Sequence, residues 1–324
     1  MTPPSARRAL VTGAAGFLGS HLVDALLAQG SEVVGLDNFY SGRRENLAHL
    51  RSSSAFTLLE HDVRAPLPAA VGAADVIYHL ACPASPPVYQ RDPLFTLETN
   101  VTGTRNVLDY ATQQRARVVF TSTSEVYGSP LVHPQPETYW GNVNPIGPRS
   151  VYDEGKRVAE TLCLVFNQRG VDVRIARVFN TYGPRMRLDD GRFVTTFIAQ
   201  ALRGQPLTVF GDGSQTRSLC YVDDLITGLL ALGESGELPF GPINLGSTDE
   251  HPVRAIAEMI LTRTGSRAAL GSAPLPQDDP PQRRPDLTLA ARLLRWAPTT
   301  DLATGLDRTI EYARGELALQ SRTN

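Results

Sequence analysis

The chain has 324 residues, of which 42% are hydrophobic and 20% are charged, and its formal net charge is −2. This length fits one large domain or two closely joined ones, and the near-neutral charge excludes a general attraction to nucleic acid or to an anionic membrane. The three cysteines, Cys82, Cys163 and Cys220, are too scattered for a disulfide framework or a zinc site, so we predict no metal. No apolar run reaches the ~18–20 residues of a membrane span, and the first residues lack a signal-peptide core. We therefore expect a cytoplasmic protein.

The first half of the chain alternates strand-like and helix-like segments. Helical periodicity covers 16–30 and 92–115. Apolar runs that predict strands lie at 7–14, 31–38, 56–63, 75–81 and 117–123. This alternation is typical of βαβ units, and strands that are apolar throughout are typical of a sheet buried on both faces. The pattern predicts an α/β fold with a Rossmann-type, doubly wound parallel sheet.

After about residue 184 the pattern changes to shorter segments separated by Pro and Gly. Helical patterns resume at 286–296 and 304–317, so the Pro-rich run at 272–285 is predicted to be an ordered loop inside the fold. We expect a first domain over residues 1–184 with a returning segment at about 219–246. The smaller C-terminal domain would then comprise 185–218 and 247–318.

The first predicted strand runs into TGAAGFLGSHL, which places Gly13, Gly16 and Gly19 between a strand and a helix. Such glycines permit a tight turn, a close approach of the backbone to a pyrophosphate, and close packing of helix on strand. Asp37 ends the next strand and can accept hydrogen bonds from both ribose hydroxyls, which favours NAD over NADP. The alternative role for Asp37 is a helix N-cap. Arg43 and Arg44 follow it and can accommodate a 2′-phosphate, so NADP stays open as an alternative cofactor.

Tyr152 and Lys156 lie four residues apart on a helical pattern and therefore share one face. An ammonium group beside a phenol, together with an oxidised nicotinamide ring, lowers the tyrosine pKa and makes it a usable base for a hydroxyl proton. A Tyr-x-x-x-Lys sequence alone is common by chance and usually lies on the surface without a catalytic role. After a nucleotide-binding half with a glycine turn, it predicts a redox site.

Further motifs extend over nearly the whole chain. With the glycine turn, HDV at 61–63, HLA at 79–81, RVFNTYGPR at 177–185 and YVDDL at 221–225, the chain resembles the nucleotide-sugar members of the extended short-chain dehydrogenase/reductase family. HLACPASPPVY, TSTSEVYG, GNVNPIGPRSVYDEGKR and VFGDGSQTR resemble, more narrowly, the UDP-glucuronate decarboxylases within it. One departure is visible, because the family pattern has lysines where this chain has Phe95 and Glu98.

The resemblance implies NAD as cofactor, UDP-glucuronate as substrate, and a homodimer formed through the helices near 92–115 and 152–168. The cofactor contacts that it implies are Gly13, Gly16, Phe17, Leu18, Gly19, Asp37, Asn38, Asp62, Val63, Leu80, Ala81, Asn100, Thr121, Tyr152 and Lys156. The substrate contacts that it implies are Tyr89, Ser124, Glu125, Asn180, Arg192, Val194, Phe210, Arg217, Arg283 and Asp286. Phe210 would stack on uracil, unless it is a core residue of a strand, and Arg283 with Asp286 would meet the diphosphate and ribose.

The implied reaction oxidises the sugar C4 hydroxyl to a ketone, releases the C6 carboxylate as carbon dioxide, and returns the hydride to C4. The product would be UDP-xylose, with a 4-keto pentose or a C4 epimer left open. The pair Ser124–Glu125 favours a decarboxylase over two related enzymes, since a 4-epimerase needs no carboxylate there and 4,6-dehydratases carry an Asp–Glu pair. Both enzymes remain alternatives. A non-catalytic NAD sensor is the alternative from another class, and an intact Ser124, Tyr152 and Lys156 argue against it.

We predict five catalytic residues, of which Tyr152 and Lys156 form the redox pair. Ser124 would hydrogen-bond the C4 oxygen. Glu125 would face the C5–C6 side and orient water or handle the C5 proton, unless it only pairs with a basic neighbour. Arg217 would hold the substrate carboxylate in a bidentate manner, unless it forms a surface ion pair.

Overall fold

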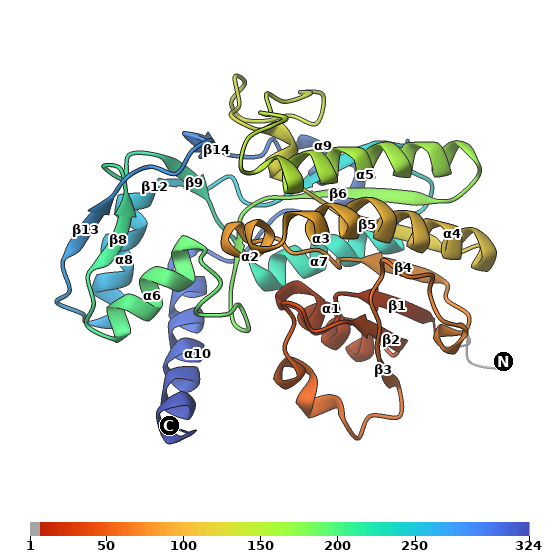
Figure 1. Ribbon diagram of the computed structural model, residues 1–324, viewed down its shortest axis with the longest axis horizontal. Helices are drawn as coiled ribbons and strands as arrows, with labels where there is room; N and C mark the ends of the chain where they lie inside the picture. The colour runs from red at the N-terminus through yellow and green to blue at the C-terminus, as the bar shows by residue number, and fades with distance from the viewer. Residues whose placement is uncertain (1–6, 324) are drawn as a thin grey trace.

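The computed structural model describes residues 7–323, and its largest element is a seven-stranded sheet in which every ladder is parallel (Figure 1). In spatial order its strands are β11 (Pro242–Leu245), β6 (Val173–Val178), β5 (Arg117–Thr123), β4 (Val76–His79), β1 (Arg8–Thr12), β2 (Glu32–Asp37) and β3 (Phe56–Glu60). The predicted Rossmann-type sheet is confirmed. The strand order reverses between β1 and β4, and open α/β sheets bind ligands outside the carboxyl ends of the strands at such a point.

Helices cover both faces of this sheet. On one face lie α1 (Phe17–Ala28) and α7 (Val222–Glu234), and on the other lie α4 (Thr104–Gln114) and α5 (Ser150–Gln168). Neighbouring residues of β1 show the alternation, because Val11 belongs to the apolar cluster with α1 and α7 while Leu10 belongs to the cluster with α4 and α5. Both side chains are fully buried. Burial on two faces explains why the strands read as continuous apolar runs.

The structure differs from the single helix expected over 92–115. This segment is divided into α3 (Pro93–Glu98), a π-helical turn η3 (Thr99–Gly103) and α4, and α2 (Pro86–Arg91) precedes it. Asp92 begins α3, since its side chain accepts a hydrogen bond from the backbone N–H of Phe95 at 3.0 Å. The π turn buries Asn100, whose Nδ2 donates to the carbonyl of Thr96. Helical periodicity alone does not reveal such a one-turn change of pitch.

Short helical turns follow several strands of the large sheet. They are η1 (Arg44–Leu50), η2 (Ala69–Val71) and η4 (Ser124–Tyr127). The last of these directly follows β5 and carries two of the predicted catalytic residues at the carboxyl edge of the sheet.

A smaller lobe lies beside the large sheet, on the left in Figure 1. Its helices are α6 (Phe193–Leu202), α8 (Val253–Thr264) and α10 (Leu302–Thr323). Its strands are β8 (Leu207–Phe210) paired with β13 (Leu270–Ala273), and β9 (Thr216–Ser218) between β12 (Glu250–Pro252) and β14 (Gln282–Arg283). None of the helices within 7–323 combines the length and the apolar character that a bilayer crossing needs.

The chain passes between the two lobes several times. After β6, the strands β7 (Thr181–Tyr182) and β10 (Cys220–Tyr221) pair with each other, with α6, β8 and β9 between them in sequence. The chain then returns through α7 to β11 at the edge of the large sheet. A second return is made by α9 (Thr288–Leu294), which contacts β11 and α7 although it falls within the predicted second domain. The domain boundaries given above stay a prediction.

Candidate active site

A cleft of about 550 Å³ lies between the lobes, at the carboxyl ends of the central strands. It brings together most of the predicted site residues from both halves of the chain. These are Gly13, Gly16, Phe17, Leu18, Gly19, Asp37, Asn38, Val63, Leu80, Ala81, Tyr89, Thr121, Ser124, Glu125, Tyr152, Lys156, Asn180, Arg192, Val194, Phe210 and Arg217. Asp62, Asn100, Arg283 and Asp286 do not line it. One continuous cleft can therefore hold a dinucleotide beside a second ligand.

The glycine turn forms the end of the cleft under β1. Gly13 has a φ of +72°, which glycine adopts without strain, and a Cβ at Gly19 would lie 2.0 Å from the carbonyl oxygen of Gly13. Helix α1 begins directly after Gly16 and leaves its first N–H groups facing this turn. Side chains larger than glycine would fill the space beside this turn. The open backbone therefore fits a bound pyrophosphate.

Asp37 lies at the end of β2 and faces the same cleft. Its carboxylate accepts hydrogen bonds from the backbone N–H groups of Ala15 at 2.9 Å and Phe39 at 2.8 Å. Burial raises the pKa of Asp37. The 3₁₀ turn that follows is preceded by Arg43, so the N-cap alternative for Asp37 does not apply. A fixed acceptor at this position fits the hydroxyls of an adenosine ribose.

Aromatic and ion-pair contacts replace the family lysines at positions 95 and 98. The ring of Phe95 stacks on Tyr40 with centroids 4.2 Å apart, and both residues line the cleft. Arg64 lies over the Phe95 ring at 4.3 Å and pairs with Glu98 at 2.8 Å and with Asp62 at 2.9 Å. Asp62 is therefore held by Arg64 and does not line the cleft, so its contact with the cofactor stays a prediction.

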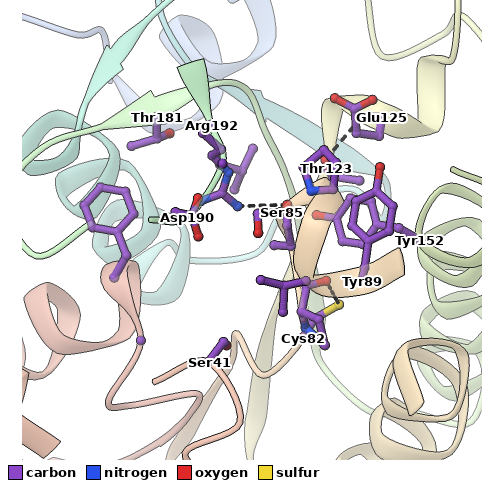
Figure 2. Close-up of a pocket in the computed structure, with 18 of the residues that line it drawn as sticks. Ser41, Cys82, Ser85, Tyr89, Thr123, Glu125, Tyr152, Thr181, Asp190 and Arg192 are labelled. Carbon is purple, nitrogen blue, oxygen red and sulfur yellow. Dashed lines mark hydrogen bonds and ion pairs between the residues drawn. The ribbon is translucent and has the colours of Figure 1, made fainter. Parts of the chain in front are cut away.

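Tyr152 and Lys156 lie on α5 with 6% and 4% of their surface exposed. The Lys156 ammonium donates to the carbonyl of Thr121 at 2.8 Å, and the Tyr152 ring stacks on Tyr89 with centroids 5.2 Å apart (Figure 2). Burial raises the pKa of Tyr152, and a hydrogen bond with Thr123 opposes this only in part. In the protein alone burial dominates, and the lowering of the Tyr152 pKa by Lys156 together with an oxidised nicotinamide ring stays a prediction.

Asn100 packs behind this pair. Its Oδ1 lies 3.0 Å from the Cys82 Sγ, and a Cβ added at Gly155 of α5 would lie 3.0 Å from its Nδ2. Asn100 does not line the cleft, and its contact with the cofactor stays a prediction.

Glu125 faces the cleft from η4, where the side chain of Thr123 accepts a hydrogen bond from its backbone N–H at 3.2 Å. Its carboxylate lies 2.7 Å from Arg149 Nη2 and 2.9 Å from Arg283 Nη1. Burial by itself raises the pKa of Glu125, but the positive charges of Arg283 and Arg149 outweigh it and hold the pKa at about 2. Glu125 therefore does pair with basic neighbours, as the alternative interpretation proposed, and it lines the cleft as well.

Arg283 lies behind Glu125 and is only 1% exposed. Its Nη1 donates to Ser124 Oγ at 2.9 Å and to Glu125, and its Nη2 donates to the carbonyl of Gly128. Asp286 lies farther away, where it accepts a hydrogen bond from the backbone N–H of Thr288. The structure thus does not bring Arg283 and Asp286 to the cleft as a diphosphate-binding pair. Arg283 instead orients the two residues that follow β5.

Two residues that sequence reasoning missed complete the charged cluster. Asp279 lies 2.9 Å from Arg217 Nη2 and 3.4 Å from Arg149 Nη1, so the predicted carboxylate clamp Arg217 already has a partner. Arg149 immediately precedes α5, within the segment that carries the Tyr–Lys pair, and this proximity is the only signal that could have identified it. Three arginines thus face two carboxylates, Glu125 and Asp279. The neighbouring Asp153 has its pKa raised to about 8 by burial and by Glu125, so it is largely protonated at neutral pH. One positive charge is therefore left for an anionic group of a ligand.

Several buried polar atoms at the cleft have no partner within residues 7–323. They include the Tyr89 hydroxyl, Ser85 Oγ and Arg149 Nε. All three residues line the cleft, and Figure 2 shows Tyr89 beside Tyr152, with Ser85 drawn between these rings and Arg192. Buried polar groups are normally hydrogen-bonded, so these atoms are suited to a polar ligand.

The small lobe provides the other wall of the cleft. Arg192 precedes α6, donates to the Ala84 carbonyl at 2.8 Å and pairs with Asp190 at 3.1 Å. Val194 is buried in α6, and both Val194 and Asn180 line the cleft. Phe210 ends β8 with 38% of its surface exposed toward the cleft. This exposure favours a stacking platform over a strand core residue.

Asp153 is a buried acid next to Tyr152, and it gives a pH-dependent prediction. Burial and the negative charge of Glu125 raise its pKa to about 8 from an ordinary 3.8. Between these values the unfolded chain has lost the proton that the native chain keeps, so this residue lowers stability as pH rises. The Asp153→Asn variant cannot ionise at this position. The melting temperature of the variant minus that of the parent should therefore increase from about pH 5 to about pH 8. Thermal melts at both pH values check this, and the exposed Asp278→Asn serves as control. A constant difference would contradict the assignment.

The fold and the cleft together define an NAD-dependent enzyme of the short-chain dehydrogenase/reductase type. The chain belongs to the NAD dependent epimerase/dehydratase family, whose model matches residues 9–246.

Curated relatives narrow the resemblance. The chain is 53% identical to UDP-glucuronic acid decarboxylase 1 of Arabidopsis thaliana over 96% of this chain and 70% of that protein. It is 51% identical to UDP-glucuronic acid decarboxylase 1 of Danio rerio over 97% of this chain and 74% of that protein. The resemblance predicted from the sequence motifs is confirmed.

Solved structures of similar fold include 4-epimerases. UDP-glucuronic acid 4-epimerase from Bacillus cereus, solved with UDP-glucuronic acid and NAD, has a TM-score of 0.86 and 31% identity, with 95% of this chain and 99% of that chain covered. UDP-glucose 4-epimerase from Thermotoga maritima, solved with UDP-glucose, has a TM-score of 0.87 and 29% identity, with 96% and 99% covered.

Proposed function

We propose that the chain decarboxylates UDP-glucuronate to UDP-xylose and carbon dioxide with NAD as cofactor. The observation that carries this proposal is the cluster in which Arg149, Arg217 and Arg283 form ion pairs with Glu125 and Asp279, beside the Tyr–Lys pair. Its excess positive charge suits a sugar that bears a carboxylate. The decarboxylase names of relatives at 51–53% identity support the same reaction, whereas the epimerases at 29–31% identity support the family alone.

NAD fits the end of the cleft formed by the glycine turn and Asp37. The turn would hold the pyrophosphate and Asp37 the adenosine ribose, while the Tyr40–Phe95 stack would enclose the adenosine side. When bound, this cofactor accepts a hydride from the sugar C4 and later returns it.

Tyr152 would take the proton of the C4 hydroxyl, and Ser124 would hydrogen-bond the same oxygen. Arg283 fixes the Ser124 hydroxyl at 2.9 Å, and the Thr121 carbonyl holds Lys156 in place. In the protein alone, burial keeps Tyr152 in its neutral phenol form. Positive charge brought to the cleft by an oxidised cofactor then favours the phenolate.

Once C4 is a ketone, the C5–C6 bond can break because its electron pair passes into the C4 enolate. Carbon dioxide leaves, and C5 then takes up a proton. Arg217 and Arg149 would orient the carboxylate before this step. Glu125 remains ionised at neutral pH, so we assign it to holding Arg149 and to accepting a hydrogen bond from the water that protonates C5.

Redox balance tests this function. Because the hydride leaves and returns to C4, UDP-glucuronate with a catalytic quantity of NAD should give UDP-xylose without a lasting rise in the absorbance of reduced nicotinamide. Product identity by NMR and released carbon dioxide check this directly. One equivalent of reduced cofactor per carbon dioxide would mean that the ketone departs. A C4-epimerised glucuronate without carbon dioxide would identify a 4-epimerase instead.

We also propose a cytoplasmic homodimer. Exposed apolar side chains lie on the two helical segments predicted to pair, with Leu94 65% and Leu97 38% exposed on α3, and Val158 43% and Leu164 40% exposed on α5. A face of this kind is commonly covered by a protein partner. Light scattering of the purified protein would measure the mass, and a monomer would contradict this proposal.

A further inference from the structure

Asp279 lies on the loop between β13 and β14, where its carboxylate reaches the charged cluster of the cleft. We propose that Asp279 tunes substrate binding for the reaction: it competes with the substrate carboxylate for arginine and thereby keeps that carboxylate loosely held. This inference rests on the proposed decarboxylation of UDP-glucuronate.

The geometry sets Asp279 directly against the arginine that would bind the substrate. Arg217 donates through Nη1 to the Thr216 carbonyl at 2.8 Å and through Nη2 to Asp279 at 2.9 Å. Both terminal nitrogens are therefore engaged. A bidentate grip on a second carboxylate requires Arg217 to share or release Asp279.

The loop that carries Asp279 is built to stay in place. Pro276, Gln277 and Pro280 line the same cleft, and the backbone N–H of Asp279 donates to the Pro276 carbonyl at 3.3 Å. Proline fixes φ and so restricts the motion of such a segment. The loop therefore restrains Asp279 next to Arg217 and Arg149.

Decarboxylation explains why a weakened grip is useful. The carboxylate enters with a negative charge, and when the C5–C6 bond breaks this charge moves to the C4 oxygen as neutral carbon dioxide departs. Interactions that hold the carboxylate strongly stabilise the ground state more than the transition state and so raise the barrier. Asp279 shares Arg217 and Arg149 with the substrate. The remaining positive charge orients the substrate carboxylate, and binding of this carboxylate in the ground state is weakened.

The test is to remove only the charge with Asp279→Asn. Binding is measured by calorimetry in a Tyr152→Phe background, so that turnover does not interfere. We expect UDP-glucuronate to bind about tenfold more tightly, since a like charge within ~4–6 Å opposes an anion by about this factor or more. UDP-xylose lacks the carboxylate and should bind as before. With Tyr152 intact, Asp279→Asn should lower kcat and KM together and change kcat/KM little.

Asp278→Asn is the matched control, since it makes the same substitution on the same loop. Its carboxylate is exposed and lies 3.0 Å from Asn144 Nδ2, away from the arginines. We expect parental binding of both sugars. If Asp279→Asn changes the affinities for both sugars equally, then Asp279 only joins the two lobes and the proposal is wrong. Weaker binding of UDP-glucuronate alone would show that Asp279 positions the arginines, which also overturns it. Failure of the proposed function is distinguishable, because the parent would then release no carbon dioxide.

Discussion

Tyr152→Phe should lower kcat by a factor on the order of 10²–10⁴, the usual cost of losing a general base. Only the hydroxyl is removed, so the ring should keep its stacking on Tyr89 and its place in α5. Binding of UDP-glucuronate should therefore change by no more than a few-fold. Initial rates of carbon dioxide release, set against calorimetric affinity, measure the two effects separately.

Tyr139→Phe is a suitable control for this experiment. Its hydroxyl accepts a hydrogen bond from the Leu131 backbone N–H, and the residue does not line the cleft. The control should turn over at the parental rate. Turnover of Tyr152→Phe within a few-fold of the parent would exclude the proposed base.

Glu125→Gln should affect both stability and chemistry. The substitution removes the charge that balances Arg283 and leaves Arg149 with Asp279 as its remaining partner. Breaking a buried ion pair in this way costs ~3–5 kcal/mol of unfolding free energy. We expect about 3 kcal/mol, the lower end of that range, because the Glu125 side chain is 17% exposed. Oxidation at C4 should persist, while carbon dioxide release slows. Urea unfolding and stopped-flow absorbance of the reduced nicotinamide, with a carbon dioxide assay, measure these effects.

Glu160→Gln separates the two effects of this substitution. Glu160 forms a comparable buried ion pair with Arg177 at 2.7 Å, and it does not line the cleft. It should lose similar stability without a selective delay of carbon dioxide release. Parental carbon dioxide release by Glu125→Gln would reduce Glu125 to a structural partner. Complete loss of C4 oxidation would place its action at or before that step.

The strands of the large sheet could be predicted within a few residues because each is buried on two faces. Val118 and Val119 of β5, for instance, belong to the apolar clusters on opposite faces of the sheet. The break in the helix over 92–115 could not be predicted in this way. The π turn ends at Gly103, where the chain approaches a distant segment closely, since a Cβ at Gly103 would lie 2.8 Å from Val63 Cγ2.

The site shows the same division. The glycine turn, Asp37 and the Tyr–Lys pair act through neighbours in sequence, so local motifs reveal where they lie. The partners of the arginines do not follow from local sequence, because Asp279 is separated from Arg217 by 62 positions and from Arg149 by 130. The sequence therefore predicted an Arg217 that is free to bind the substrate carboxylate. The effect of burial on the Tyr152 pKa also depends on residues distant in sequence, so it could not be predicted either.

The position of β11 at the edge of the large sheet has a consequence for biosynthesis. Strand β6 ends at Val178, but its outer neighbour β11 begins only at Pro242, and α7, which covers one sheet face, begins at Val222. While the ribosome makes the intervening segment, the nascent sheet has an open edge at β6, and the face that α1 shares with α7 is only partly covered. Open edges and exposed apolar faces promote aggregation. We expect the chain to depend on chaperones until its α7–β11 segment has left the ribosomal tunnel.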